Sequence, residues 1–179
     1  MPKPYLGNIA VMEANFDSAR FRQVLGHVPT GVVVVTGVDA TGAPSGITIG
    51  SFVSVSLDPP LVGFFPGNAS RSWSHIAEGK GFCANVLTSD QDELCWRFAR
   101  EPEGGMAARF DGLDWTKSPS GMPVLVGALA VIDCSIESVT PAGDHSFVLG
   151  RVQHLAVSES VGEAMVFYRG KVTGVTPQQ

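Results

Sequence analysis

Short apolar runs rich in β-branched residues, each ended by glycine, proline or another turn-forming residue, constrain the fold of this chain more than any other feature. They lie at 31–38, 47–56, 81–87, 128–139, 146–157 and 164–168. Helices do not alternate regularly with these runs, so most connections between strands should be hairpins. Closing such a sheet removes the edges that it would otherwise expose. We therefore expect a mainly β protein with short helices, built as a closed or partly closed antiparallel barrel.

The run at 47–56 alternates most cleanly of all. One set of side chains should face the core: Ile47, Ile49, Val53 and Val55. The opposite set carries hydroxyls, a glycine and one aromatic ring: Thr48, Gly50, Phe52, Ser54 and Ser56. This second face has the composition of a half-buried surface that binds a ligand, and equally that of any solvated strand. The prolines at 59–60 should end the strand in a turn.

The first helix is expected just ahead of the first strand. Apolar residues fall at i, i+3, i+4 and i+7, namely at Phe21, Val24, Leu25 and Val28. Asp17 or Ser18 is available as the N-cap, and Pro29 ends the pattern. These positions predict one amphipathic helix.

Two further helices are expected in the middle of the chain. The segment 70–78 should form a short helix capped by Ser70 or Ser72. Ser89 should cap a third helix over 90–100, where acidic residues cluster in the first turn.

Length and composition indicate one domain. The 179 residues, 18.8 kDa, leave no room for two sizeable units, and we expect the domain to span 16–175, after an arm at 1–15 and before a tail at 176–179. The polar, glycine-rich segment 101–115 should be a mobile surface loop. Hydrophobic residues make up 44% of the chain and charged residues only 16%, which favours an apolar exterior that another subunit covers.

Several classes of function are disfavoured. Twelve Lys and Arg against 17 Asp and Glu give a net charge of −5, the wrong sign for binding nucleic acid or an anionic membrane. The three cysteines form no CxxC pair, the histidines have no metal-ligand spacing, and the N-terminal segment lacks the apolar core of a signal peptide. We therefore expect no metal and a cytoplasmic protein. Motifs of Rossmann domains, P-loops, zincins and α/β-hydrolases are also absent.

Six local patterns remain, and together they resemble one family. They are PTGVVVVT at 29–36, GITIGSFVSVSLDPPLVGF at 46–64, SRSW at 70–73, FCANVL at 82–87, GDH at 143–145 and YRG at 168–170. In this order and spacing they resemble the short-chain flavin reductases, FMN-binding split barrels that supply reduced flavin to two-component monooxygenases. The resemblance covers 21–174, and its most specific parts are SFVSVSLDPPL and GDH.

The resemblance implies a homodimeric split barrel with antiparallel, Greek-key-like strands. It further implies that FMN or FAD lies along the 46–56 strand, that NADH or NADPH is the co-substrate, and that a separate monooxygenase receives the reduced flavin. Because no Rossmann domain is present, the nicotinamide dinucleotide should fold into the same groove as the flavin. The implied activity is hydride transfer from the nicotinamide to the flavin. The alternative is a split-barrel module that binds flavin without NAD(P)H turnover.

The implied flavin contacts come from several segments. Along the central strand, backbone groups of Thr48, Ile49 and Gly50 would meet the ring edge, with side-chain contacts from Ser51, Phe52 and Ser54. The other implied contacts are Thr30, Asn85, Val86, Leu87, Tyr168 and Arg169. Two of these have a competing interpretation: Asn85 as a core amide that needs a partner, and Tyr168 as an aromatic that closes the barrel.

The start of the 70–78 helix is a candidate phosphate site. Free backbone N–H groups, the hydroxyls of Ser70 and Ser72 and the guanidinium of Arg71 could converge there. The simpler interpretation is ordinary capping beside a solvated arginine, and capping is compatible with phosphate binding.

Asp144 and His145 are the candidate catalytic pair. Spacing alone favours a Gly-Asp hairpin turn followed by the first residue of a strand. The resemblance implies instead that the His145 imidazole contacts the nicotinamide and that Asp144 fixes its orientation. A Ser-His-Asp hydrolase is the least favoured interpretation, because no nucleophile elbow is present.

Overall fold

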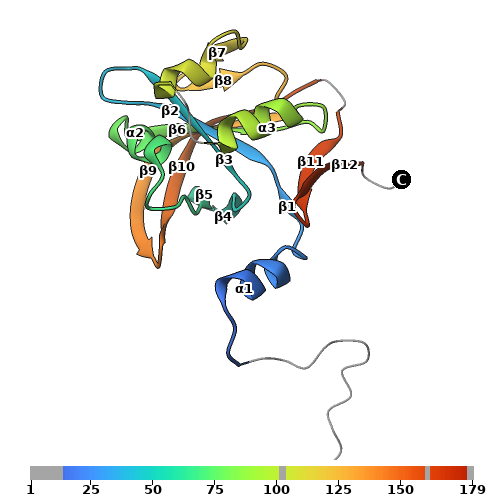
Figure 1. Cartoon of the computed structure of the whole chain (residues 1–179). Helices are drawn as coiled ribbons and strands as arrows, with labels where there is room; N and C mark the ends of the chain where they lie inside the picture. The colour runs from blue at the N-terminus through green and yellow to red at the C-terminus, as the bar shows by residue number, and fades with distance from the viewer. Residues whose placement is uncertain (1–13, 101–103, 160–161, 177–179) are drawn as a thin grey trace, which may run out of the picture.

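The computed structural model describes residues 14–100, 104–159 and 162–176 (Figure 1). Most of the expected arm and tail, at 1–13 and 177–179, lies outside the described residues. Within them, the main antiparallel sheet has the strand order β3-β2-β6-β9-β10-β5-β4. Its strands are β2 (Val33–Val38), β3 (Pro44–Ile49), β4 (Val53–Leu57), β5 (Pro60–Phe64), β6 (Gly81–Val86), β9 (Ala130–Ala142) and β10 (His145–Val157).

The connection between β3 and β4 closes this sheet into a barrel. The two strands stand at opposite ends of the strand order, yet only residues 50–52 separate them in the chain. Such a connection spans at most about 14 Å, so the two ends of the sheet are drawn together. The predicted partly closed antiparallel barrel is confirmed. We call residues 50–52 the β3–β4 link.

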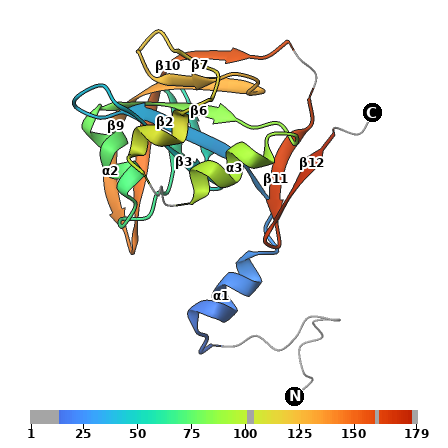
Figure 2. The same ribbon diagram turned by 45° about the horizontal axis from the view of Figure 1, so that its top comes forward.

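Smaller elements surround the barrel. β1 (Thr30–Gly31), β11 (Ala164–Tyr168) and β12 (Lys171–Val175) form one small sheet, and β7 (Trp115–Lys117) and β8 (Pro123–Leu125) form another. The helices are α1 (Ser18–Leu25), α2 (Arg71–Glu78), α3 (Asp92–Ala99) and a 3-10 turn, η1 (Met106–Phe110). In both views α2 and α3 lie against the barrel while α1 projects away from it (Figures 1 and 2). None of the helices in the described ranges is long and apolar enough to cross a bilayer.

Two aromatic clusters fill the core. On one side of the sheet, Phe64 packs edge-on against Trp73 of α2 and Phe82 of β6, with centroids 5.6 and 5.1 Å apart. On the other side, Phe98 of α3 packs against Phe110 of η1 at 5.2 Å. Trp73 and Ile76, three residues apart on one face of α2, and the β-branched residues of β2 contribute further buried surface. Fully burying such side chains contributes about 1.5 to 3 kcal/mol each.

All three cysteines are free and buried. Burial, with a smaller contribution from Asp133, raises the pKa of the Cys83 thiol to about 12. Burial likewise raises the pKa of Cys134 to about 12. Both thiols are therefore protonated at neutral pH.

The faces of β4 differ from the prediction. Val53 and Val55, expected in the core, are 47% and 46% exposed, whereas Phe52 from the opposite set packs on the core and stacks on Phe64 at 6.4 Å. The alternation does not continue from β3 because the chain crosses from one end of the sheet to the other at the link. A register shift between Ser54 and Ser56 changes the phase again.

The segment 101–115 was expected to be a mobile loop, and this is wrong for its described part. η1 forms there, and Met106, Arg109 and Phe110 are buried. Nη1 of Arg109 donates to the carbonyl of Gly46 at 2.8 Å and to Ser72 Oγ at 3.1 Å. Phe110 completes an aromatic cluster, so two buried side chains order a segment whose glycines and charges suggested mobility.

The predicted N-cap is correct for α2 but not for α3. Ser70 caps α2 as predicted, its hydroxyl accepting from the N–H of Trp73 at 3.2 Å. The N-cap of α3 is Gln91 rather than Ser89, because residues 88–91 first form a turn closed by a hydrogen bond from Gln91 N to Thr88 O.

Asn85 links three elements inside the core. Its Nδ2 donates to Val34 O and Thr36 Oγ1, both at 3.1 Å, and its Oδ1 accepts from Leu125 N at 2.8 Å. Because the amide is fully buried, no water can replace these partners. These contacts support the interpretation of Asn85 as a core amide.

We expect Asn85→Ala to lower the free energy of unfolding by about 2 to 3 kcal/mol, because it leaves buried groups on two strands without partners. Urea titration measures this loss. The control is Gln153→Ala, which removes an exposed hydrogen bond to Ser135 and should change stability by less than about 0.5 kcal/mol. A stable Asn85→Ala protein with weakened flavin binding would instead make Asn85 a flavin contact.

Candidate functional site

The β3–β4 link presents unpaired backbone. The N–H and C=O groups of residues 50–52 have no hydrogen-bond partner within the part of the chain that the structure describes. Gly50 is exposed, and Ser51 and Phe52 are half-buried. A Cβ atom on Gly50 would lie only 2.9 Å from Thr30 Oγ1, so glycine permits this close approach of the two segments. Polar backbone at a partly covered edge is suited to a planar ligand with donors and acceptors.

Most side chains along this strand are engaged elsewhere, including those of Thr48 and Ile49, which were predicted to meet the ring through their backbone groups. The Thr48 hydroxyl donates to the carbonyl of Cys95 in α3 at 2.7 Å, and Ile49 is buried in the core. Ser51 Oγ accepts from the N–H of Phe65 at 2.9 Å, which fastens the link to the end of β5. Ser54 is exposed. Hydrogen bonding to a ligand at this edge therefore falls to the backbone more than to the hydroxyls.

The N-terminus of α2 offers a cation and free N–H groups. The N–H groups of Arg71 and Ser72 have no partner among the described residues. Arg71 is exposed and forms no ion pair with any described carboxylate. Ser72 is buried, and its hydroxyl accepts from Arg109 and donates to Met106 Sδ at 3.5 Å. Ser72 can therefore meet a phosphate only through its backbone.

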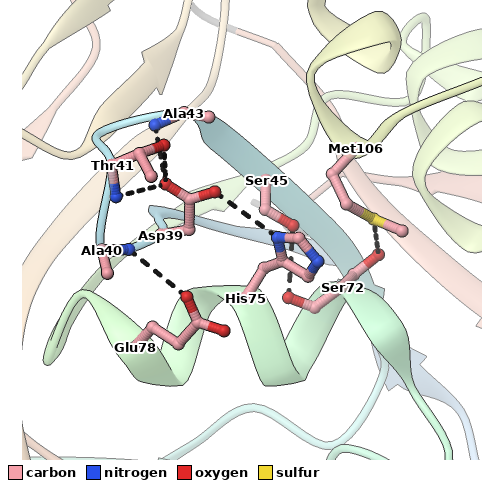
Figure 3. A network of polar contacts seen from close by, with 9 residues as sticks. All are labelled: Asp39, Ala40, Thr41, Ala43, Ser45, Ser72, His75, Glu78 and Met106. Atoms are coloured by element: carbon pink, nitrogen blue, oxygen red, sulfur yellow. Dashed lines mark hydrogen bonds and ion pairs between the residues drawn. The ribbon is translucent and has the colours of Figure 1, made fainter.

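Polar contacts hold α2 against the β2–β3 hairpin (Figure 3). Asp39 in the hairpin turn accepts from Thr41, which is the main cause of the lowered pKa of its carboxyl. Its second oxygen lies 3.6 Å from His75 Nδ1 of α2. Ser45 Oγ of β3 donates to the carbonyl of Ser72 at 3.2 Å. The helix start is thus fixed relative to β3, the strand that leads into the link.

The candidate catalytic pair lies at the tip of the β9–β10 hairpin. Pairing extends to Ala142 and His145, so the turn contains only Gly143 and Asp144, the Gly-Asp hairpin turn that the spacing favoured. Gly143 has φ +70°, which a glycine adopts without strain. His145 Nδ1 lies 2.7 Å from Asp144 Oδ1, and this hydrogen bond lowers the pKa of the Asp144 carboxyl. Both side chains are exposed.

Residues 65–70, which join β5 to α2, bring these groups together. Phe65 bonds to Ser51 of the link, Pro66 O accepts from Ser146 N at 3.0 Å, and Gly67 forms a bridge with His145. Gly67 O then accepts from Ser70 N at 3.0 Å. The link, the phosphate candidate and the catalytic pair therefore surround one short segment, although they are far apart in the sequence.

Other predicted residues lie apart from this segment or face inward. Leu87 is buried in the core cluster around Phe98, and Val86 packs on the Phe64 cluster. Tyr168 and Arg169 lie at the β11–β12 turn, beside the end of α1, where Arg169 N donates to Gly26 O at 3.0 Å. Tyr168 is 41% exposed and edge-on to His27, so it does not close the barrel as a core aromatic.

Three residues near the site were not predicted. Phe65 is 40% exposed and packs on Phe147 at 4.9 Å beside the link, although its neighbour Phe64 is fully buried. Asn68 bonds to the hairpin tip, and Arg109 bonds to Ser72 in α2. Adjacent residues at a strand end point to opposite faces of the sheet, so the phenylalanine after Phe64 is expected to leave the Phe64 cluster. Nothing local marked Asn68 or Arg109.

The described residues fit a flavin nucleotide. The unpaired backbone of the link matches the hydrogen-bonding edge of the ring, Phe52 and Phe65 offer apolar contact, and Arg71 with its free N–H groups matches a phosphate. No group of three or more histidine, cysteine or acidic side chains suited to a metal occurs in the described ranges.

Comparisons with known proteins agree with this fit. The family model "Flavin reductase like domain" matches residues 25–176. The chain is 45% identical to the reductase subunit HsaB of a flavin-dependent monooxygenase from Rhodococcus jostii, over 97% of this chain and 86% of that protein. It is 45% identical to a flavin reductase from Pseudomonas putida, over 92% of this chain and 94% of that protein.

A solved structure has the same fold. The NADH:FAD oxidoreductase SgcE6 of Streptomyces globisporus superposes with a TM-score of 0.84 and 34% identity, covering 94% of this chain and 99% of that one. The split-barrel prediction is thereby confirmed. The chain belongs to the flavin reductase family.

Proposed function

We propose that this chain holds FMN or FAD along the β3–β4 link, takes hydride from NADH or NADPH bound in the same groove, and releases reduced flavin to a separate monooxygenase. As a flavin reductase it is an NAD(P)H-dependent oxidoreductase. One observation supports the binding mode above the others. The link with its unpaired backbone and His145 both contact the 65–70 segment, which leads directly into Arg71. A binding module without turnover has no use for an exposed imidazole at that place.

The chain's own residues bind and orient. A bound flavin supplies the acceptor for the hydride. Backbone groups of the link fix the ring edge, and Arg71 with the N–H groups of α2 holds the phosphate. The protein therefore lowers the barrier chiefly by holding two reactants in one orientation.

His145 is suited to contact the nicotinamide carboxamide. In the neutral imidazole, the tautomer with its proton on Nδ1 donates to the Asp144 carboxylate and leaves Nε2 as an acceptor. The hydrogen bond lowers the pKa of the Asp144 carboxyl, so the carboxylate that accepts from Nδ1 persists above that lowered pKa and is lost as the pH falls through it. A Cβ atom on Gly67 would lie 3.9 Å from Nε2, so the glycine at this position leaves space beside that nitrogen.

Two features of assembly and location belong to the same proposal. Apolar side chains of α1 and β4 are exposed, including Phe21 at 52% and Leu57 at 91%, and a second copy of the chain would cover them. The three reduced, buried cysteines suit the cytoplasm.

A homodimer is therefore expected at micromolar concentration, with twice the 18.8 kDa chain mass in light scattering. Replacing Leu57 and Val55 together by serine should shift the mass toward the monomer without unfolding the barrel, because both side chains are exposed. A wild type that stays monomeric would contradict the proposed dimer.

Arg71→Ala should weaken FMN binding by about 1.5 to 3 kcal/mol, the range for a charge-assisted hydrogen bond, and leave riboflavin binding nearly unchanged. Fluorescence titration of both flavins measures the two losses. Lys117→Ala, which removes an exposed cation on β7, is the matched control and should affect neither. Equal losses for FMN and riboflavin would show that Arg71 does not hold the phosphate.

His145→Ala should lower kcat/KM for reduced nicotinamide while flavin affinity stays within a few fold, because lost positioning of the reactants acts on that ratio. Steady-state oxidation of NADH and NADPH, with FMN or FAD added, measures the effect beside flavin titration. Unchanged kinetics would remove His145 from the site. A wild type that binds flavin but oxidises neither nicotinamide would leave the binding module as the function.

A further inference from the structure

We propose that Asn68 is a positioning residue that holds His145 in its working orientation. The inference rests on the proposed role of His145 and adds a residue outside every recognised pattern of the sequence. Asn68 uses its backbone and both atoms of its amide on the hairpin tip. Its N–H donates to Asp144 O at 2.9 Å, its Nδ2 donates to Gly143 O at 3.3 Å, and its Oδ1 accepts from Ser146 Oγ at 2.8 Å.

These three bonds flank His145 on both sides. Gly143 and Asp144 precede it and Ser146 follows it, so Asn68 restrains the backbone before and after the imidazole. Asn68 makes no bond to the imidazole itself. Any effect of Asn68 on the nicotinamide therefore acts through the placement of His145.

The tip needs such a restraint. β5 pairs with β10 only from Val148 to Arg151, so residues 143–147 extend past the end of that strand. A two-residue turn with exposed side chains on both arms has few contacts of its own. Apart from the bond between Ser146 N and Pro66 O, Asn68 supplies the hydrogen bonds that fasten this end of the hairpin among the described residues.

The same residue relates the tip to the phosphate candidate. Asn68 lies two positions before Ser70, the N-cap of α2, and Gly67 O accepts from Ser70 N at 3.0 Å. His145 is thus fixed to the turn that opens the helix carrying Arg71. Loss of one of these hydrogen bonds would let the hairpin tip rotate, and the imidazole would move relative to a flavin anchored at the start of α2. Small misplacements of reacting partners lower reaction rates strongly.

A purely structural role is separable because Asn68 is exposed. Truncating it removes no core packing, so Asn68→Ala should keep the melting temperature and the flavin affinity close to those of the wild type. It should lower kcat/KM for NADH about 10-fold. In flavin-free protein, hydrogen exchange of residues 143–147 should become faster.

The decisive experiment is a double-mutant cycle. Asn68→Ala, His145→Ala and the double variant are compared in NADH oxidation, with Gln153→Ala, which removes an exposed hydrogen bond in the middle of the same hairpin, as the matched control. If Asn68 acts through His145, the double variant is no slower than His145→Ala. Ser146→Ala removes one of the three bonds and should give a smaller loss in the same direction, which preserves the test if Asn68→Ala folds poorly.

Three outcomes overturn the inference. Additive losses in the double variant, or wild-type kinetics and exchange for Asn68→Ala and Ser146→Ala beside a damaged His145→Ala, would reject Asn68 alone and leave the proposed function standing. A His145→Ala enzyme with wild-type kinetics would reject the role of His145 together with that of Asn68.

Discussion

The covalent connection between the two end strands of the main sheet governs this structure. β3 and β4 belong to opposite ends of the strand order, and a link of three residues forces those ends together. A link this short leaves its own backbone groups outside the hydrogen-bond ladder of the sheet. The same three residues therefore close the barrel and create its polar edge. The surrounding segments then serve that edge: β5 is fastened to it through Ser51, and the turn after β5 carries the start of α2 and meets the hairpin tip.

Local patterns in the sequence predicted much of this arrangement. β-branched runs predicted the strands, and a serine before a short apolar helix predicted the Ser70 cap, because both signals depend on neighbours in the chain. The faces of β4 escaped prediction because strand alternation assumes one continuous sheet, whereas the link transfers the chain to the other end of it. The role of Arg109 escaped prediction because its partner Gly46 lies 63 residues away in the sequence. The role of Asn85 stayed ambiguous because its partner Val34 lies 51 residues away. Asn68 escaped prediction for the same reason, because its side-chain partners Gly143 and Ser146 lie 75 and 78 residues later.

The site combines a rigid interior with an exposed rim. Arg109 and Ser72 are buried and join η1, α2 and β3 beneath the surface. Arg71, Asp144 and His145 are exposed above them and free to meet ligands. Adjacent residues at the start of α2 therefore have different roles. Ser72 anchors the helix to the interior, and Arg71 faces solvent. Such a division suits an enzyme that must release one of its bound molecules after each turnover, because the rim can exchange ligands while the frame stays in place.

Burial of the thiols protects them from an oxidant that forms from the enzyme's own product. Reduced flavin in aerated water yields hydrogen peroxide, and peroxide oxidises thiolates far more readily than thiols. Burial raises the pKa values of Cys83 and Cys134 to about 12. At neutral pH both sulfurs are therefore present as thiols and not as thiolates. The core therefore excludes peroxide from both sulfurs and keeps them in the less reactive thiol form. The enzyme can release reduced flavin without oxidation of these two cysteines.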